Sequence, residues 1–170
     1  ILSIILNRAD TNNAITSKMR DELNEILDMA IIDKNISKIL LSSNGKIFSA
    51  GGAVEEFGLV SDPASAHWIR SVGLPAKKLM QLQAKLCVNI KGGAIGAGIE
   101  MAAFSKKIIA SQNSWFQLPE LKYGLIPGAG GTVSIPRRIG RQRTAYMAIT
   151  TKKINAKKAL EWGLIDAIED

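Results

Sequence analysis

Short apolar runs alternate with helical segments along the chain, and this alternation limits the fold more than any other feature. Strands are predicted over 1–6, 37–42, 47–49, 86–90, 107–110, 115–117 and 164–168. Helices are predicted over 18–32, 97–104, 134–150 and 156–162, with a loosely helical stretch over 55–84. The recurring unit is strand, turn, strand, helix. This order predicts an α/β fold with crossover connections, organised as a single domain over residues 1–170.

Composition limits the class of protein and the compartment in which it can work. The 170 residues are 46% hydrophobic, which suits one globular domain. Cys87 is the single cysteine, so an internal disulfide is excluded and a reducing, cytoplasmic location is favoured. Because Cys87 lies in an apolar run, we expect a buried structural thiol. No apolar run is long enough to span a bilayer, so no membrane partner is predicted.

The net charge of +7 favours an anionic partner, either nucleic acid or a phosphorylated small molecule such as coenzyme A. The basic residues gather only at Arg137, Arg138, Arg141 and Arg143, which a solvated helix face also explains. No aromatic-studded basic motif supports nucleic-acid binding. His67 is the only histidine, which argues against a Ser-His-Asp triad, and no metal site is predicted.

Two glycine-rich turns each lie between a predicted strand and a helical segment, over 48–53 and 92–98. Backbone N–H groups at the start of a helix have no intrahelical acceptor, so two converging turns can bind a developing oxyanion. The alternative is that these glycines only form tight turns. Residues 93–98 also contain the glycines of a dinucleotide fingerprint, but in the wrong order.

Two glutamates occupy unusual surroundings. Glu100 lies in an apolar helix of small residues that offers it no charge partner. Such a carboxyl must be paired, protonated or functional, or the helix must turn it to solvent. Glu120 follows Pro119 near a predicted helix start, where the helix dipole alone would favour an acid. Together they suggest an acid/base pair beside an anion-binding site.

Several motifs, in order, resemble one family. They are Ile4–Arg8, Asn13–Thr16, Phe48–Gly52, Gly92–Ala103, Phe116–Glu120, Gly124–Thr132, Pro136–Arg137 and Ala159–Asp166. The chain resembles the crotonase superfamily, of the enoyl-CoA hydratase/isomerase type, over essentially its whole length. The most specific stretch ends in Pro127-Gly128-Ala129-Gly130-Gly131-Thr132.

The resemblance implies a crotonase-like ββα spiral that assembles as a homotrimer or hexamer and binds acyl-CoA thioesters. It implies that the N–H groups of Gly52 and Ala97 hold the thioester oxygen, and that Glu100 and Glu120 are catalytic. Gly128 would help to position water. No separate cofactor is implied, because coenzyme A belongs to the substrate. The residues implied to line the thioester and pantetheine are Gly52, Ala53, Val54 and Glu55.

Some positions depart from the family pattern. Ala53 stands where Asp is common, Lys85 where Pro usually precedes the strand, and Leu118 where some hydratases carry Gln. The chain also opens with Ile1 and ends at Asp170, where family members continue into C-terminal trimerisation helices. We therefore expect those helices to be absent from this chain.

The leading hypothesis is hydration of a trans-2-enoyl-CoA, because both glutamate positions are filled. Double-bond isomerisation, which needs only the second glutamate in this family, is the close alternative. A non-catalytic relative that binds acyl-CoA or RNA through its basic surface is a third. A nucleotide-dependent oxidoreductase ranks last, because of the glycine order.

Overall fold

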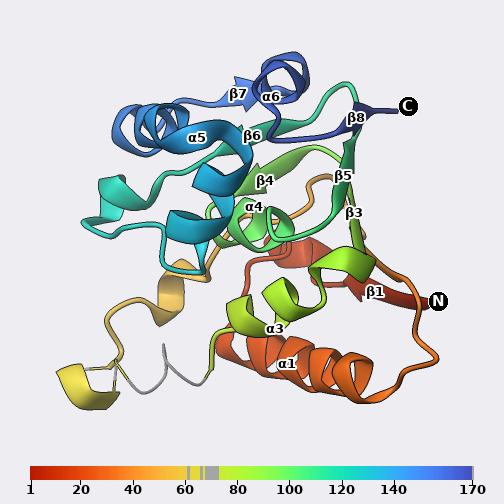
Figure 1. The fold of residues 1–170 in the computed structure, drawn as a ribbon. Coiled ribbons are helices and arrows are strands. Elements are labelled where there is room, and N and C mark those ends of the chain that lie inside the picture. The colour runs from red at the N-terminus through yellow and green to blue at the C-terminus, as the bar shows by residue number, and fades with distance from the viewer. Residues whose placement is uncertain (61, 66, 68–72, 170) are drawn as a thin grey trace.

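The structure is a computed structural model that describes residues 1–60, 62–65, 67 and 73–169. Its larger sheet has five strands in the order β1-β2-β3-β5-β8, all paired in parallel (Figure 1). The strands are β1 (Leu2–Leu6), β2 (Ile39–Ser43), β3 (Leu86–Ile90), β5 (Lys107–Ala110) and β8 (Ala167–Ile168). Parallel neighbours require crossovers, so the predicted α/β architecture is confirmed.

A smaller sheet consists of β4 (Gly93–Ile95), β6 (Trp115–Gln117) and β7 (Ile154–Asn155). Two isolated parallel bridges widen it, Ser49 with Ala94 and Ile15 with Gly52. Successive turns of the chain thus place one strand in the larger sheet and the next extended segment in the smaller one. This is the ββα spiral that the family resemblance implied.

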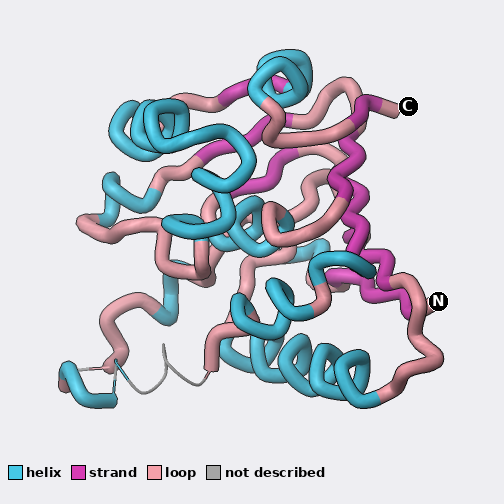
Figure 2. Tube along the Cα trace, viewed as in Figure 1, coloured by secondary structure: helices cyan, strands magenta, loops and turns pink. Residues whose placement is uncertain are grey.

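The helices are α1 (Ser17–Ile32), α3 (Ala76–Gln81), α4 (Ala97–Ala102), α5 (Gly131–Thr150) and α6 (Ala156–Trp162). Short 3-10 turns include η2 (Val54–Glu56) and η4 (Glu120–Tyr123). Figures 1 and 2 show α1 and α3 side by side at one end and α5 and α6 at the other, with α4 between them. This central position of α4 brings its side chains into the interior.

Local sequence explains α1 well. The hydroxyl of Thr16 accepts a hydrogen bond from Met19 N, which satisfies one free donor of the first turn. Leu23, Leu27 and Ala30 recur at helical spacing and are all buried. The predicted helix therefore forms where its cap and its apolar stripe agree.

Several short elements differ from the sequence prediction. Residues 93–95 form a strand rather than part of a turn, and β7 was not expected. Residues 47–49 contribute only the bridge at Ser49, and the predicted strand over 164–168 is reduced to β8. Strands of two or three residues have no detectable periodicity, so only their partners define them.

Two longer predictions also change. Helix α5 begins at Gly131, earlier than predicted, and is interrupted at Gly140, where φ is 79° and ψ is 163°. Within the predicted helical stretch over 55–84, the structure contains η2, α3 and a 3-10 turn over Gln83–Lys85, while residues 61, 66 and 68–72 lie outside the described part.

Cys87 is half-buried rather than fully buried, so the expectation of a buried thiol is wrong. Among the described residues, no helix has both the length and the apolar character needed to cross a bilayer.

Candidate active site

Glu100 points into the protein from α4. Only 1% of its surface is exposed, so the alternative of a solvent-facing glutamate is wrong. Its Oε2 accepts hydrogen bonds from Ala129 N and Gly131 N, both at 2.8 Å. Two main-chain donors on one buried carboxylate oxygen fix its orientation and favour its charged form.

Glu120 approaches from η4, on the other side of the start of α4. A Cβ atom on Gly96 would collide with Glu120 Oε1, so this carboxyl lies directly against the residue that precedes Ala97. Its Oε2 is buried and has no hydrogen-bond donor among the described residues. A buried carboxylate oxygen without a donor is costly unless a proton or a ligand satisfies it.

The two carboxyl groups influence one another. Burial raises the pKa of Glu100 to about 8, and the negative charge of Glu120 adds to that rise. Burial also raises the pKa of Glu120. Two acids this close cannot both ionise readily, so the pair holds one proton through neutral pH. A pair that shares one proton can offer one acid and one base, which are the roles that the sequence predicts for these two residues.

The two predicted oxyanion amides lie beside these acids. Gly51 O accepts a hydrogen bond from Ile15 N at 2.7 Å, and Ala53 N donates to Ile15 O at 3.0 Å. Successive N–H groups in an extended chain point to opposite sides, so Gly52 N–H points away from Ile15. A Cβ atom on Gly51 would lie 3.7 Å from Ala97 N, which shows how closely the two loops approach.

Both amide-bearing residues, Gly52 and Ala97, are half-buried. Ala97 is the first residue of α4, where a backbone N–H has no intrahelical acceptor. Glu100 lies one helical turn further on, its N–H donating to Gly96 O at 2.9 Å. The structure therefore brings together all four predicted residues, Gly52, Ala97, Glu100 and Glu120.

The other predicted site residues surround this centre less closely. Ala53 is buried, whereas Val54 and Glu55 are exposed on η2. Gly128 is exposed and immediately precedes Ala129, whose N–H holds Glu100. Phe57 covers the Gly52 side, because a Cβ on Gly52 would lie 3.1 Å from its ring.

An aromatic contact joins the end of η2 to the end of η4 at the surface. The rings of Phe57 and Tyr123 meet edge to face, with centroids 6.1 Å apart. Both residues are partly exposed and apolar, as are Val54, Leu121 and Ile126 nearby in the sequence. Exposed apolar side chains of this kind suit contact with the apolar part of a ligand.

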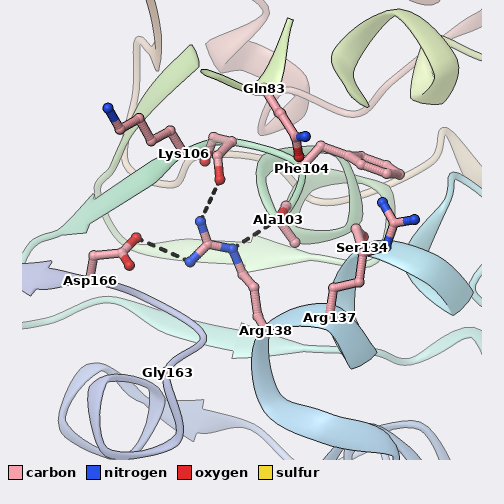
Figure 3. Close-up of a pocket in the computed structure, with 10 residues that line it drawn as sticks. Gln83, Ala103, Phe104, Lys106, Ser134, Arg137, Arg138, Gly163 and Asp166 are labelled. Carbon is pink, nitrogen blue, oxygen red and sulfur yellow. Dashed lines mark hydrogen bonds and ion pairs between the residues drawn. The ribbon is translucent and has the colours of Figure 1, made fainter. Parts of the chain in front are cut away.

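A cavity lies away from these residues, at the C-terminal end of α4 (Figure 3). It measures about 330 Å³, and Arg138 crosses it. The Arg138 guanidinium donates to the carbonyl oxygens of Ala103, Ser105 and Leu164 and to Asp166 Oδ2. All of these partners are protein groups, so Arg138 links elements rather than forming part of a solvated basic face.

Sequence reasoning missed the groups that orient Glu100. Ala129 and Gly131 act through their backbone N–H groups, so the identity of their side chains does not indicate this role. The available signal was the run of small residues over 128–131, because Gly131 must lack a side chain to let Glu100 in: a Cβ there would lie 2.5 Å from Glu100 Cγ. Two residues that depart from the family pattern, Lys85 and Leu118, make none of the site contacts described here. Lys85 Nζ donates to Ile36 O at 2.7 Å, and Leu118 is fully buried.

Known proteins match both the sequence and the fold. The family model for enoyl-CoA hydratase/isomerase matches residues 1–169. The 2,3-dehydroadipyl-CoA hydratase of Escherichia coli is 29% identical over 99% of this chain and 65% of that protein. The trans-2-decenoyl-[acyl-carrier-protein] isomerase of Streptococcus mutans is 28% identical over 97% of this chain and 64% of that protein.

Solved structures agree. Enoyl-CoA hydratase from Thermoplasma volcanium superposes with a TM-score of 0.86 at 32% identity, covering 99% of this chain and 67% of that one. The chain spans about two thirds of the length of these relatives. The match over the whole chain, the spiral fold and the shared sequence lead to one assignment: the chain belongs to the enoyl-CoA hydratase/isomerase family of the crotonase superfamily.

Proposed function

We propose that the protein adds water across the 2,3 double bond of a trans-2-enoyl-CoA thioester. The observation that carries this proposal is the buried pair of interacting glutamates, one held by two backbone N–H groups, beside the amides of Gly52 and Ala97. Hydration of a conjugated thioester needs one base, one acid and a site for negative charge on the thioester oxygen. The four residues supply each of these in one place.

In the proposed reaction, Glu100 removes a proton from water as the water oxygen bonds to the β-carbon. The electron pair of the double bond moves toward the thioester carbonyl, and the enolate oxygen that forms accepts hydrogen bonds from Gly52 N and Ala97 N. Glu120 then gives its proton to the α-carbon. The product is a 3-hydroxyacyl-CoA. Glu100 ends protonated and Glu120 ionised, so a proton passing between the neighbouring carboxyl groups resets the site.

These roles require the proton to lie on Glu120 when water attacks. The two N–H donors at Glu100 Oε2 favour that distribution, because they stabilise the ionised form of Glu100. Burial of Glu100 opposes it. A bound water that donates to Glu100 and a thioester that excludes solvent from Glu120 shift the balance toward the reactive state.

Isomerisation of the double bond is the second candidate. Burial raises the pKa of both carboxyl groups, so either one can hold the proton that the pair shares. A single base against the substrate is enough to move a proton between two carbons. One relative of this chain is named as an isomerase of trans-2-decenoyl-[acyl-carrier-protein].

Substitution of each glutamate separates the two reactions. In the full-length protein, Glu100→Gln and Glu120→Gln should each lower turnover of a short-chain trans-2-enoyl-CoA by about 10²–10⁴-fold, the range for lost general acid–base catalysis. The assay follows loss of the conjugated thioester chromophore. If Glu100→Gln retains isomerisation of a 3-enoyl-CoA while hydration is lost, the result supports isomerisation as the function. Undiminished rates in both variants reject both mechanisms.

The remaining expectations belong to the same proposal. Water and the thioester supply all atoms of the product, so we propose that no separate cofactor takes part. We also keep the homotrimer or hexamer and the cytoplasmic location as proposals, which light scattering and fractionation of the full-length protein would test.

A further inference from the structure

Ser49 is a fully buried polar residue between β2 and η2 that the proposed chemistry does not use. Its hydroxyl donates to Asn13 O at 2.8 Å and accepts from Gly51 N at 3.1 Å. One hydroxyl thus joins the segment that precedes α1 to the loop that carries Gly52. No solvent reaches it, so protein groups alone determine its orientation.

The backbone of Ser49 is attached to the second loop. Ser49 N donates to Gly93 O at 3.2 Å, and Ile95 N donates to Ser49 O at 3.0 Å. These bonds hold Ser49 against β4, which runs through Gly96 directly into Ala97. The side chain also packs on α4, because a Cβ on Gly98 would lie 2.7 Å from Ser49 Cβ. Ser49 therefore contacts both segments whose amides form the proposed oxyanion site.

The hydroxyl controls the peptide that precedes the first amide. Gly51 is buried and has φ of 93°, a conformation that mainly glycine adopts. Because glycine has many other accessible backbone conformations, this one depends on the hydrogen bonds that hold it. Its N–H is satisfied by Ser49 Oγ. Without that acceptor the Gly51 N–H is left unpaired in the interior, and the peptide reorients to recover a partner. Gly52 N–H is the next donor along the chain and moves with it.

We propose that Ser49 is a positioning residue that fixes the Gly52 and Ala97 amides relative to each other, so that both point at one thioester oxygen. This inference rests on the proposed function. It predicts that loss of the hydroxyl weakens stabilisation of the enolate more than binding of the ground-state thioester. A residue that only supports the fold would weaken neither selectively.

The test compares Ser49→Ala with Ser114→Ala in the full-length protein. Ser114 is the matched control, a buried serine whose hydroxyl donates to Ile90 O at 3.1 Å and shares a hydrogen bond with Ser111 Oγ at 2.9 Å, so that its partners lie outside the segments 49–53 and 92–98. Both variants should lower Tm. Ser49→Ala should also lower kcat for a short-chain trans-2-enoyl-CoA by about 10-fold or more, the cost of a slightly misplaced catalytic group, with KM nearly unchanged. Ser114→Ala should retain kcat.

A binding measurement gives a second readout that does not need turnover. The enolate of a 3-oxoacyl-CoA carries negative charge on the thioester oxygen, whereas a saturated acyl-CoA does not. Ser49→Ala should weaken binding of the first by a larger factor than binding of the second, as measured by calorimetry. If the wild-type protein neither hydrates nor isomerises enoyl-CoA, the proposed function fails, and this comparison still tests Ser49.

The outcomes separate cleanly. Retention of wild-type kcat and of the wild-type affinity ratio, with Tm lowered as in Ser114→Ala, would overturn the inference and leave Ser49 a structural residue. Should Ser49→Ala fail to fold, Ser49→Cys keeps a weak donor and acceptor at the same position. It should then show the same separation of kcat from KM, to a smaller degree, and its absence would equally overturn the inference.

Discussion

At the scale of single residues, the site is built from positions where a side chain is missing as much as from those where one is present. Glu100 is recognisable in the sequence, because a carboxyl in an apolar helix of small residues requires an explanation. Its donors at Ala129 and Gly131 are not recognisable, because they lie 29 and 31 residues further along the chain and act through the backbone. Ser49 escapes notice for a similar reason, since its partners are main-chain atoms.

Gly131 gives a residue-scale prediction. Because a Cβ there would lie 2.7 Å from Glu100 Oε2 and Glu100 is fully enclosed, Gly131→Ala must displace the carboxylate. Displacement of a catalytic group by about 1 Å costs on the order of 10²-fold in rate. Val133→Ala, at an exposed position in the same helix, is the control and should keep its activity. Steady-state kinetics of both variants would check this, and a fully active Gly131→Ala protein would contradict the contact.

At the scale of elements, predictability follows from how local the determinants are. Helix α1 and strand β3 carry their own periodicity and end signals, so sequence alone identifies them. Strand β4 does not: Gly93 forms part of it because the ring of Trp115, 22 residues away, lies against a position with no side chain. The interruption of α5 lies at Gly140, whose φ of 79° is a conformation that glycine adopts most readily, although a glycine inside a helical pattern does not by itself predict a break.

Arg138 gives an element-scale prediction, because it joins α5 to the end of α4 and to the segment before β8. Its guanidinium satisfies carbonyl oxygens of Ala103 and Ser105 at 3.0 and 2.6 Å, and its side chain is 11% exposed. Arg138→Met should destabilise the protein by about 2–4 kcal/mol, since each buried carbonyl left without a donor costs about 1–3 kcal/mol.

The neighbouring Arg137 is the control for the Arg138 substitution. Its side chain is exposed and among the described residues hydrogen-bonds only to the sulfur of Met80, so Arg137→Met should change stability by less than about 0.5 kcal/mol. Urea unfolding of both variants measures the difference. Equal stabilities would show that Arg138 does not hold these elements together.

At the scale of the whole molecule, the spiral explains why residues from distant parts of the sequence meet. Each turn delivers one extended segment to the smaller sheet, so the loop after β2 lies beside β4, and η4 lies beside the start of α4. The motifs that carry the family resemblance coincide with the places where successive turns touch. Composition and periodicity alone indicated only an α/β fold with an acid pair near a glycine-rich turn.

The buried acid pair ties the stability of the whole molecule to pH. A raised pKa means that folded Glu100 keeps its proton at a pH where the unfolded chain has released it. The folded state therefore binds more protons than the unfolded state, and the free energy of unfolding must fall as pH rises from about 5 to about 8, by at most about 1.4 kcal/mol per pH unit for one group. The pKa of Glu120 is also raised, so its contribution has the same sign.

The Glu100→Gln variant tests this pH dependence, because glutamine cannot ionise. Its amide oxygen can still accept hydrogen bonds from Ala129 N and Gly131 N. The free energy of unfolding of the variant should therefore depend less on pH, and the variant should gain stability relative to wild type as pH rises. Urea unfolding of both proteins at pH 5, 6, 7 and 8 measures this, and a wild-type profile as flat as that of the variant would mean that Glu100 ionises in the folded protein without cost.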